Sequence, residues 1–167
     1  MAADDSKLDG FNASLWLLDE YHAARNSKLK DVLQSSQGMR DNPLGVIITT
    51  AGFDKLGPCY QYRTTCTEVL RGLKRDDSLF SLIYTLDEGD DWRDEKVWVK
   101  SNPNLGVTVK ASYLRGEVRK AINSPSEEVG VKTKNINLWC DTDTTWIPEH
   151  YILSSSADLH LEDFAGR

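Results

Sequence analysis

The stretch LWLLDE at residues 15–20 decides the interpretation of the fold, because four apolar residues run directly into two acids. An unbroken apolar run of this length is typical of a strand buried on both faces of a parallel sheet. A second apolar run at residues 44–48 ends in TTAG at residues 49–52. Residues 26–38 are expected to be helical, with Asn26 capping the start and Gly38 closing the end. Strand, helix and strand over this length predict a βαβ unit with parallel strands.

Both apolar runs are expected to end at the same edge of the sheet, since parallel strands share their carboxyl edge. Ligands bind at that edge in open α/β sheets. Asp19 can ligate Mg²⁺ there, directly or through water, because the strand holds its carboxylate at the edge. Glu20 is one residue further on and can polarise a water for attack on a γ-phosphate. Four apolar residues followed by Asp-Glu form the Walker B pattern, whose chemistry needs both acids at this place.

Thr49 and Thr50 end the neighbouring strand and are expected beside the two acids. Their hydroxyls can hydrogen-bond the attacking water or the γ-phosphate and so report hydrolysis. The alternative is that the threonines only end a strand and begin a turn at Gly52. The two pairs together, one helix apart, favour a nucleotide site.

The chain after Gly57-Pro58 is predicted to be mostly helical. Alternating apolar residues, Phe80, Leu82, Tyr84 and Leu86, predict one further strand at residues 79–86. Helices are expected over residues 59–73, around Val97 and Trp98 up to Asn102-Pro103, over residues 111–122, and from Ser124-Pro125 to about Trp139, where Glu127 completes a capping box.

Three regions follow from these elements. Residues 1–86 are predicted to be an α/β region that carries the nucleotide-site motifs, and residues 87–153 a helical region on which Trp146-Ile147-Pro148 packs back. Residues 154–167 are serine-rich and then acidic, and are expected to form a flexible tail.

Composition excludes several classes of protein. The 167 residues carry a net charge of −6 with a hydrophobic fraction of 40%, which fits one soluble domain better than a free-standing nucleic-acid binder, usually basic. The three cysteines form no CxxC pair, so a disulfide framework or zinc site is not expected, and a reducing cytoplasm fits better. No apolar run is long enough for a membrane span, and the acidic N-terminus is unlike a signal peptide.

The motifs resemble those of one family. LWLLDEYHA and MRDNPLGVIITTAGFD look like the Walker B segment and coupling motif of the terminase large subunits of tailed phages and prophages. DDWRDEKVWVKSNPNLGVTV, the SPSEE helix start and KNINLWCDTDTTWIP look like the region between the ATPase core and the nuclease domain of this family. The resemblance covers residues 8–152. It implies an α/β fold, in which residues 1–86 are a partial ATPase core with part of the parallel sheet of a P-loop-type ATPase, and residues 87–153 are a mostly helical linker subdomain.

The resemblance also implies roles for particular residues. Asp19 would bind Mg²⁺ and Glu20 would be the catalytic carboxylate. Thr49, Thr50 and Gly52 would form the coupling motif, which links hydrolysis to movement of DNA. Arg40 would touch phosphate in the same or a neighbouring subunit, but an ordinary surface arginine is the favoured alternative. His22 is expected to form structural hydrogen bonds.

In the whole protein the resemblance implies ATP and Mg²⁺ as cofactors. It implies the small terminase subunit, the portal protein and double-stranded DNA as partners, a ring of identical subunits, and the host cytoplasm as location. The chain contains no GxxxxGK[ST] loop, and only 18 residues precede Asp19. We expect that the chain alone binds no nucleotide, hydrolyses no ATP, lacks the nuclease domain and cuts no DNA. A missing neighbour strand would leave an open sheet edge beside Val46 and Ile48, which predicts self-association or disorder around residues 40–56.

Two alternatives to the terminase interpretation stay open from the residues alone. DExH followed by a threonine-rich motif also occurs in helicases, although the arginine-rich motif of their second domain is absent here. A non-catalytic module that binds DNA or the portal is the other alternative. Its DNA-facing strip would consist of Arg63, Arg71, Lys74, Arg75, Lys110, Arg115, Arg119 and Lys120, for which a solvated helix face is the simpler interpretation.

Overall fold

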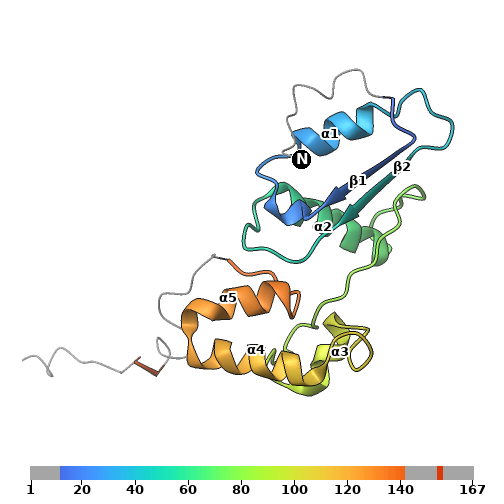
Figure 1. Cartoon of the computed structure of the whole chain (residues 1–167). Helices are drawn as coiled ribbons and strands as arrows, with labels where there is room; N and C mark the ends of the chain where they lie inside the picture. Colours follow the sequence, from blue (N-terminus) through green and yellow to red (C-terminus); the bar gives the residue numbers. More distant parts are fainter. Residues whose placement is uncertain (1–11, 142–153, 156–167) are drawn as a thin grey trace, which may run out of the picture.

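The predicted strand–helix–strand unit is present in the computed structural model, which describes residues 12–141 and 154–155 (Figure 1). Strand β1 (Leu15–Asp19) pairs in parallel with β2 (Leu44–Ile48), in a register that sets Asp19 opposite Ile48. Helix α1 (Lys28–Ser35) connects them and begins where Asn26 Oδ1 accepts the Lys28 N–H at 3.1 Å. The parallel order of the strands is therefore confirmed.

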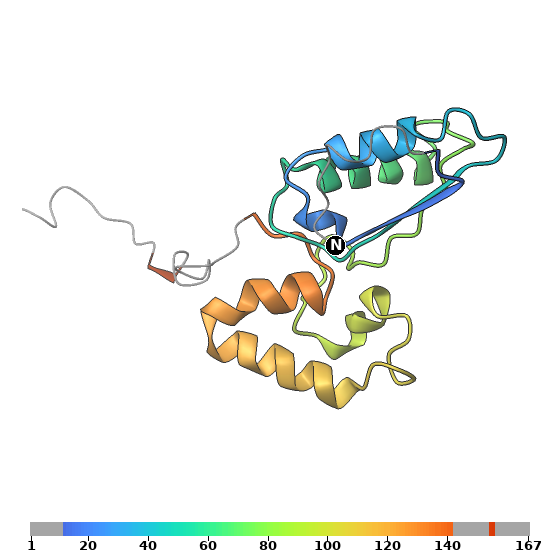
Figure 2. The same ribbon diagram turned by 45° about the horizontal axis from the view of Figure 1, so that its top comes forward.

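One face of the strand pair is covered and the other is open. Trp16 and Leu18 are half-buried, whereas Leu15 and Leu17 are 61% and 59% exposed. Figure 2 shows α1 and α2 (Pro58–Leu70) on the same side of the strands. The expectation that β1 is buried on both faces is wrong for this chain, because within the described residues no layer packs on the second face.

A tryptophan holds the two strands and α1 together. Trp16 lies beside Gly45 on the covered face, and a Cβ added at residue 45 would lie 2.2 Å from its ring. The Trp16 indole N–H donates to Gln37 Oε1 at 2.8 Å, and the amide of Gln37 donates to the carbonyl of Leu44 at 3.1 Å. Gln37 is buried with its polar atoms paired, so it joins the end of α1 to both strands at little desolvation cost.

Helix α2 covers the short helix that follows β1. Gly57 precedes its first residue, Pro58, which suits proline because the first helical N–H has no partner within the helix. Cys59 and Cys66 are buried on its inner face, next to the turn η2 (Tyr21–Ala23), where Tyr21 is only 2% exposed. The helix predicted at residues 59–73 is confirmed, with its last turn ending at Leu70.

Residues 79–86 are extended but pair with no strand among the described residues, so the strand predicted here is absent. The period of two is real: Phe80, Leu82 and Tyr84 are exposed, and the residues between them are half-buried. Without a neighbouring strand the backbone has no ladder to join, and the segment instead links the two halves of the molecule (Figure 1). Strand β2 likewise pairs only with β1 in the described chain, and self-association through its free edge stays a prediction.

The second half of the molecule is a small helical unit, as predicted. It consists of η3 (Glu95–Val97), α3 (Trp98–Ser101), α4 (Ala111–Asn123) and α5 (Pro125–Lys134). Its core is apolar, with Leu114 and Ile136 1% and 0% exposed. The other members of this core, which we call the helical core, are Leu86, Trp92, Trp98, Val118, Ala121 and Val131.

Helix α5 begins at Pro125 after Ser124, as predicted, but its end and its capping box differ from the prediction. It stops at Lys134 rather than near Trp139, because Asn137 adopts a left-handed conformation with φ of 56° and the chain turns back. The Ser124 side chain makes no cap bond to the helix and lies 3.0 Å from Ser126 Oγ, so the predicted capping box is not formed. The Trp146-Ile147-Pro148 segment, and the tail apart from residues 154–155, lie outside the described residues.

The contact between Trp16 and Gly45 generates a prediction. Gly45→Ala is expected to lower the free energy of unfolding by roughly 1–3 kcal/mol, because the added methyl overlaps the indole ring. Urea unfolding followed by circular dichroism measures this loss. Trp16→Leu should make the same Gly45→Ala change nearly neutral, and an equal loss in both backgrounds would contradict the packing argument.

Candidate functional site

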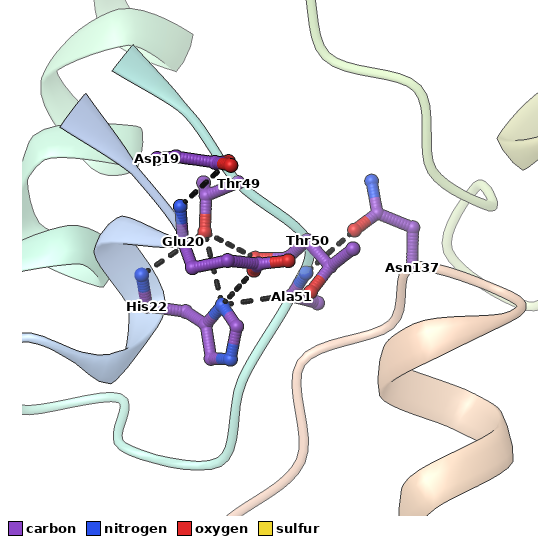
Figure 3. Close-up of polar contacts among 7 residues, drawn as sticks. All are labelled: Asp19, Glu20, His22, Thr49, Thr50, Ala51 and Asn137. Carbon is purple, nitrogen blue, oxygen red and sulfur yellow. Dashed lines mark hydrogen bonds and ion pairs between the residues drawn. The ribbon is translucent and has the colours of Figure 1, made fainter. Parts of the chain in front are cut away.

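The two acids and the two threonines meet at the carboxyl edge of the strand pair, as the parallel register requires. Asp19 ends β1 and Glu20 follows it, while Thr49 and Thr50 follow β2 directly (Figure 3). The Glu20 N–H donates to the carbonyl of Ile48 at 2.8 Å, which extends the pairing of the two strands to the site itself. Residues almost 30 positions apart are thereby held side by side.

His22 connects the acid to both threonines. Its Nδ1 lies 3.0 Å from Glu20 Oε2, 3.1 Å from Thr49 Oγ1 and 3.5 Å from Thr50 Oγ1. Its backbone N–H also donates to Thr49 Oγ1 at 3.0 Å. The structure thus places His22 as the hydrogen-bonding centre of the site, consistent with the structural role expected for it.

The hydrogen bonds of Thr49 assign the proton on the His22 ring. Thr49 Oγ1 donates its proton to the carbonyl of Thr50 at 2.9 Å and is left as an acceptor. The Glu20 carboxylate is an acceptor only. We therefore assign the proton to His22 Nδ1, from which it is shared between Glu20 and Thr49.

Glu20 is held in a strained backbone conformation. Its φ of 54° and ψ of 43° lie in the left-handed region, which a residue with a Cβ rarely adopts. This conformation turns the chain from β1 into η2 and brings His22 back over the acid. Strained residues of this kind concentrate where a side chain must be aimed at a ligand.

Asp19 is available to a ligand. Its Oδ1 accepts the N–H of Glu20 at 2.9 Å, and its side chain is otherwise exposed. Among the described residues, no group of three or more His, Cys, Asp and Glu side chains could hold a metal ion alone. The carboxylate and hydroxyl oxygens at this edge nevertheless suit a hard cation such as Mg²⁺, which takes much of its coordination from water and phosphates.

The underside of the site is apolar. Burial raises the pKa of the Cys59 thiol to about 11, and outweighs the smaller opposing effect of the nearby Thr49 hydroxyl. The thiol therefore stays protonated at neutral pH and serves as packing beneath Thr49.

Gly52, a residue of the predicted coupling motif, has little room for a side chain. A Cβ there would lie 3.2 Å from both His22 Cβ and the Trp139 ring, closer than ordinary contacts. The turn after the threonines therefore packs closely between His22, which follows β1, and Trp139, which follows α5.

Asn137 and Trp139 complete the site and were missed by sequence reasoning. The Ala51 N–H donates to Asn137 Oδ1 at 2.7 Å, and the Trp139 ring meets the Tyr60 ring edge-on at 5.0 Å. They lie about 86 residues along the chain from the threonines. No local sequence pattern predicts the contact between Asn137 and Ala51. The signal available in the sequence was an asparagine just after the last helix, where a left-handed residue often ends a helix.

Arg40 does not reach this edge. It precedes β2, at the opposite end of the strand from Thr49, and its guanidinium donates to the carbonyl of Asn12 at 3.0 and 2.6 Å. Phosphate contact within the same chain does not fit this placement, and contact in a neighbouring subunit stays a prediction.

The proposed DNA-facing strip is partly neutralised. Arg75, Arg115 and Lys120 pair with Asp77, Glu95 and Glu117 respectively. In the acidic turn at residues 87–95, Lys100 Nζ lies 2.6 Å from Asp87 and 2.7 Å from Asp90, and its hydrogen bond holds the pKa of Asp90 below the usual range. These pairings favour solvated surfaces over binding sites.

The strain at Glu20 generates a prediction with a matched control. Glu20→Gly and Glu20→Ala both remove the carboxylate, but glycine adopts the left-handed conformation freely, so Glu20→Gly is expected to be the more stable by about 1 kcal/mol. Urea titration of both variants measures the difference.

The control pair is Glu117→Gly and Glu117→Ala in the middle of α4. Glycine is the less stable choice there by about 1 kcal/mol, so the order of the two variants should reverse. The same order at both positions would argue against strain at Glu20.

Comparisons with known proteins identify one family. The family model described as the terminase large subunit ATPase domain matches residues 1–68, and the model of its endonuclease domain matches residues 73–167, more than half of the chain. The expectation that the chain lacks the nuclease domain is therefore corrected in part: residues 73–167, which include the segment interpreted as a linker, match the endonuclease-domain model. Within the described residues, no helix is long and apolar enough to cross a membrane.

Two individual relatives extend these matches. Protein YmfN of Escherichia coli K12 is 36% identical over 160 residues, which are 95% of this chain and 35% of that protein. The crystal structure of the large terminase of bacteriophage HK97 aligns with a TM-score of 0.67 at 22% identity, over 78% of this chain and 26% of that one. The chain thus spans about a third of the length of the curated relative. It is a member of the terminase large subunit family.

Proposed function

We propose that this chain supplies the acidic and coupling part of the ATP-hydrolysing site of a viral DNA-packaging motor. The observation that carries the proposal is the meeting of Asp19 and Glu20 with Thr49 and Thr50, bridged by the Nδ1 of His22. A carboxylate pair, one member of which is joined to hydroxyls that follow the neighbouring parallel strand, can both promote hydrolysis and respond to it.

Asp19 is proposed to hold the cation. Its carboxylate is exposed at the end of a strand and is oriented by the N–H of Glu20 at 2.9 Å. Mg²⁺, when bound, neutralises charge on the phosphate oxygens of the nucleotide.

Glu20 is proposed to orient the attacking water. Its carboxylate is the only acid in contact with His22 among the described residues, and its side chain is 58% exposed, so one oxygen can face solvent while the other contacts His22. Positioned acceptors of this kind typically contribute about 10²–10⁴-fold in rate.

Thr49, Thr50 and Gly52 are proposed to form the coupling loop, residues 49–52. A water drawn to Glu20 competes with His22 for the same carboxylate, and His22 shares its Nδ1 proton with Thr49. A change at the acid therefore reaches the loop through one hydrogen-bonded side chain.

We propose that the phosphate-binding part of the motor lies outside these 167 residues. The sequence contains no GxxxxGK[ST] loop to cradle phosphates. For the whole protein we propose ATP and Mg²⁺ as cofactors, double-stranded DNA, the small subunit and the portal as partners, a ring of subunits, and action in the bacterial host cytoplasm.

Mn²⁺ binding tests the cation site in the chain itself. Mn²⁺ takes the same oxygen ligands as Mg²⁺ and broadens amide NMR signals near it. We expect the signals of Glu20 and Thr49 to broaden first, and Asp19→Asn to abolish this effect. Asp77→Asn, which removes an exposed aspartate from a surface pair, is the matched control and should leave the broadening unchanged. Broadening that survives Asp19→Asn, or that starts in the acidic turn, would contradict the assignment.

Hydrolysis of Mg·ATP tests the division of the site. We expect no hydrolysis above background by the chain alone, with Glu20→Gln as the control. Hydrolysis that is lost in Glu20→Gln would show that residues of this chain form a phosphate cradle of another kind. Hydrolysis unaffected by Glu20→Gln would point to a contaminant or to another acid.

A further inference from the structure

The segment at residues 137–141, here the returning segment, contacts the coupling loop and the residues that follow it at several points. The Cys140 N–H donates to the carbonyl of Gly52 at 3.1 Å. Lys55 Nζ lies 2.7 Å from Asp141 Oδ1, and the Trp139 ring covers Gly52. Asn137 makes the contact nearest to the threonines, since Ala51 directly follows Thr50 (Figure 3).

The side chain of Asn137 joins three distant parts of the chain. Its Oδ1 accepts the Ala51 N–H at 2.7 Å, and its Nδ2 donates to the carbonyl of Tyr84. Its own carbonyl accepts the hydroxyl of Thr85 at 2.9 Å. The loop after β2, the extended segment at residues 79–86 and the end of α5 therefore converge on one amide.

The backbone of Asn137 explains why an asparagine stands here. The residue lies just past α5 with φ of 56°, and the Leu138 N–H closes the helix end on the carbonyl of Lys132 at 2.8 Å. Glycine is the usual residue in this conformation and asparagine the next most tolerated. Of these two, only asparagine has a side chain that can bond Ala51 and Tyr84.

Asn137 is anchored on the side of the helices. The preceding Ile136 is fully buried in the helical core, and the following Leu138 packs against it. Leu86, one residue after Thr85, belongs to the same core. A displacement of Ala51 must therefore break the Asn137 bond or move residues packed in the helical core.

We propose that Asn137 is a positioning residue that couples the coupling loop to the helical unit: it holds the Ala51 backbone and transmits displacement of Thr49 and Thr50 to the helical core. The inference rests on the proposed function in treating residues 49–52 as the coupling loop. Its geometry and its test involve no nucleotide or metal, so its failure leaves the cation and hydrolysis tests untouched.

The first measurement is amide hydrogen exchange at Ala51. Asn137→Gly keeps the left-handed backbone but removes the side chain, so the variant is expected to fold while Ala51 exchanges roughly 5- to 10-fold faster. Asn137→Asp should keep Ala51 partly protected, because one carboxylate oxygen still accepts its N–H while the other faces the carbonyl of Tyr84 and cannot donate to it. Unchanged exchange at Ala51 in Asn137→Gly would overturn the proposal.

The second measurement separates transmission from simple stabilisation. Thr49→Val removes the hydroxyl that receives the His22 N–H while keeping the side-chain shape. We expect this change to shift the backbone NMR signals of Leu86 and Val131 in the helical core. In an Asn137→Gly background the same change should shift them much less. Equal shifts in both backgrounds would overturn the proposal and assign transmission to Trp139 at Gly52.

Discussion

The parallel pairing of β1 with β2 is the constraint on which the rest of the site depends. Its last hydrogen bond, from the Glu20 N–H to the carbonyl of Ile48 at 2.8 Å, holds the acid level with the start of the coupling loop. A shift of register by one residue would turn Asp19 to the other face of the sheet. The Trp16–Gly45 contact favours this register, because Gly45 has no Cβ and so leaves room for the Trp16 ring.

Two residues with side chains, Glu20 and Asn137, adopt left-handed backbone conformations. Each turns the chain next to the proposed coupling loop. Each carries a side chain with polar partners, where glycine would satisfy the backbone alone. Glu20 is joined through His22 to Thr49, and Asn137 is joined directly to Ala51. The loop therefore has an acid on one side and the helical unit on the other, an arrangement suited to passing a local change to a packed body.

The predictions that failed depended on what packs against or pairs with a helix or strand, which the local sequence does not show. The run at residues 15–18 does form a strand, but one face is open because no second layer packs on it among the described residues. The alternation at Phe80, Leu82 and Tyr84 does reflect an extended chain, but a strand also needs a partner for its backbone groups, and none lies beside it in the described part. Helix α5 ends early because Asn137 leaves the helix, although the apolar pattern continues to Trp139.

The sequence by itself determined the βαβ unit, the helices that follow it, the acids and threonines of one sheet edge, and the family to which the motifs point. These features rest on periodicity, turn residues and strand polarity, which are local properties of the chain. Only the tertiary structure decided that His22 bridges Glu20 to Thr49, that Arg40 lies at the far end of the sheet, and that Asn137 holds Ala51. Those contacts join residues 27, 28 and 86 positions apart, and packing rather than local pattern determines which of them meet.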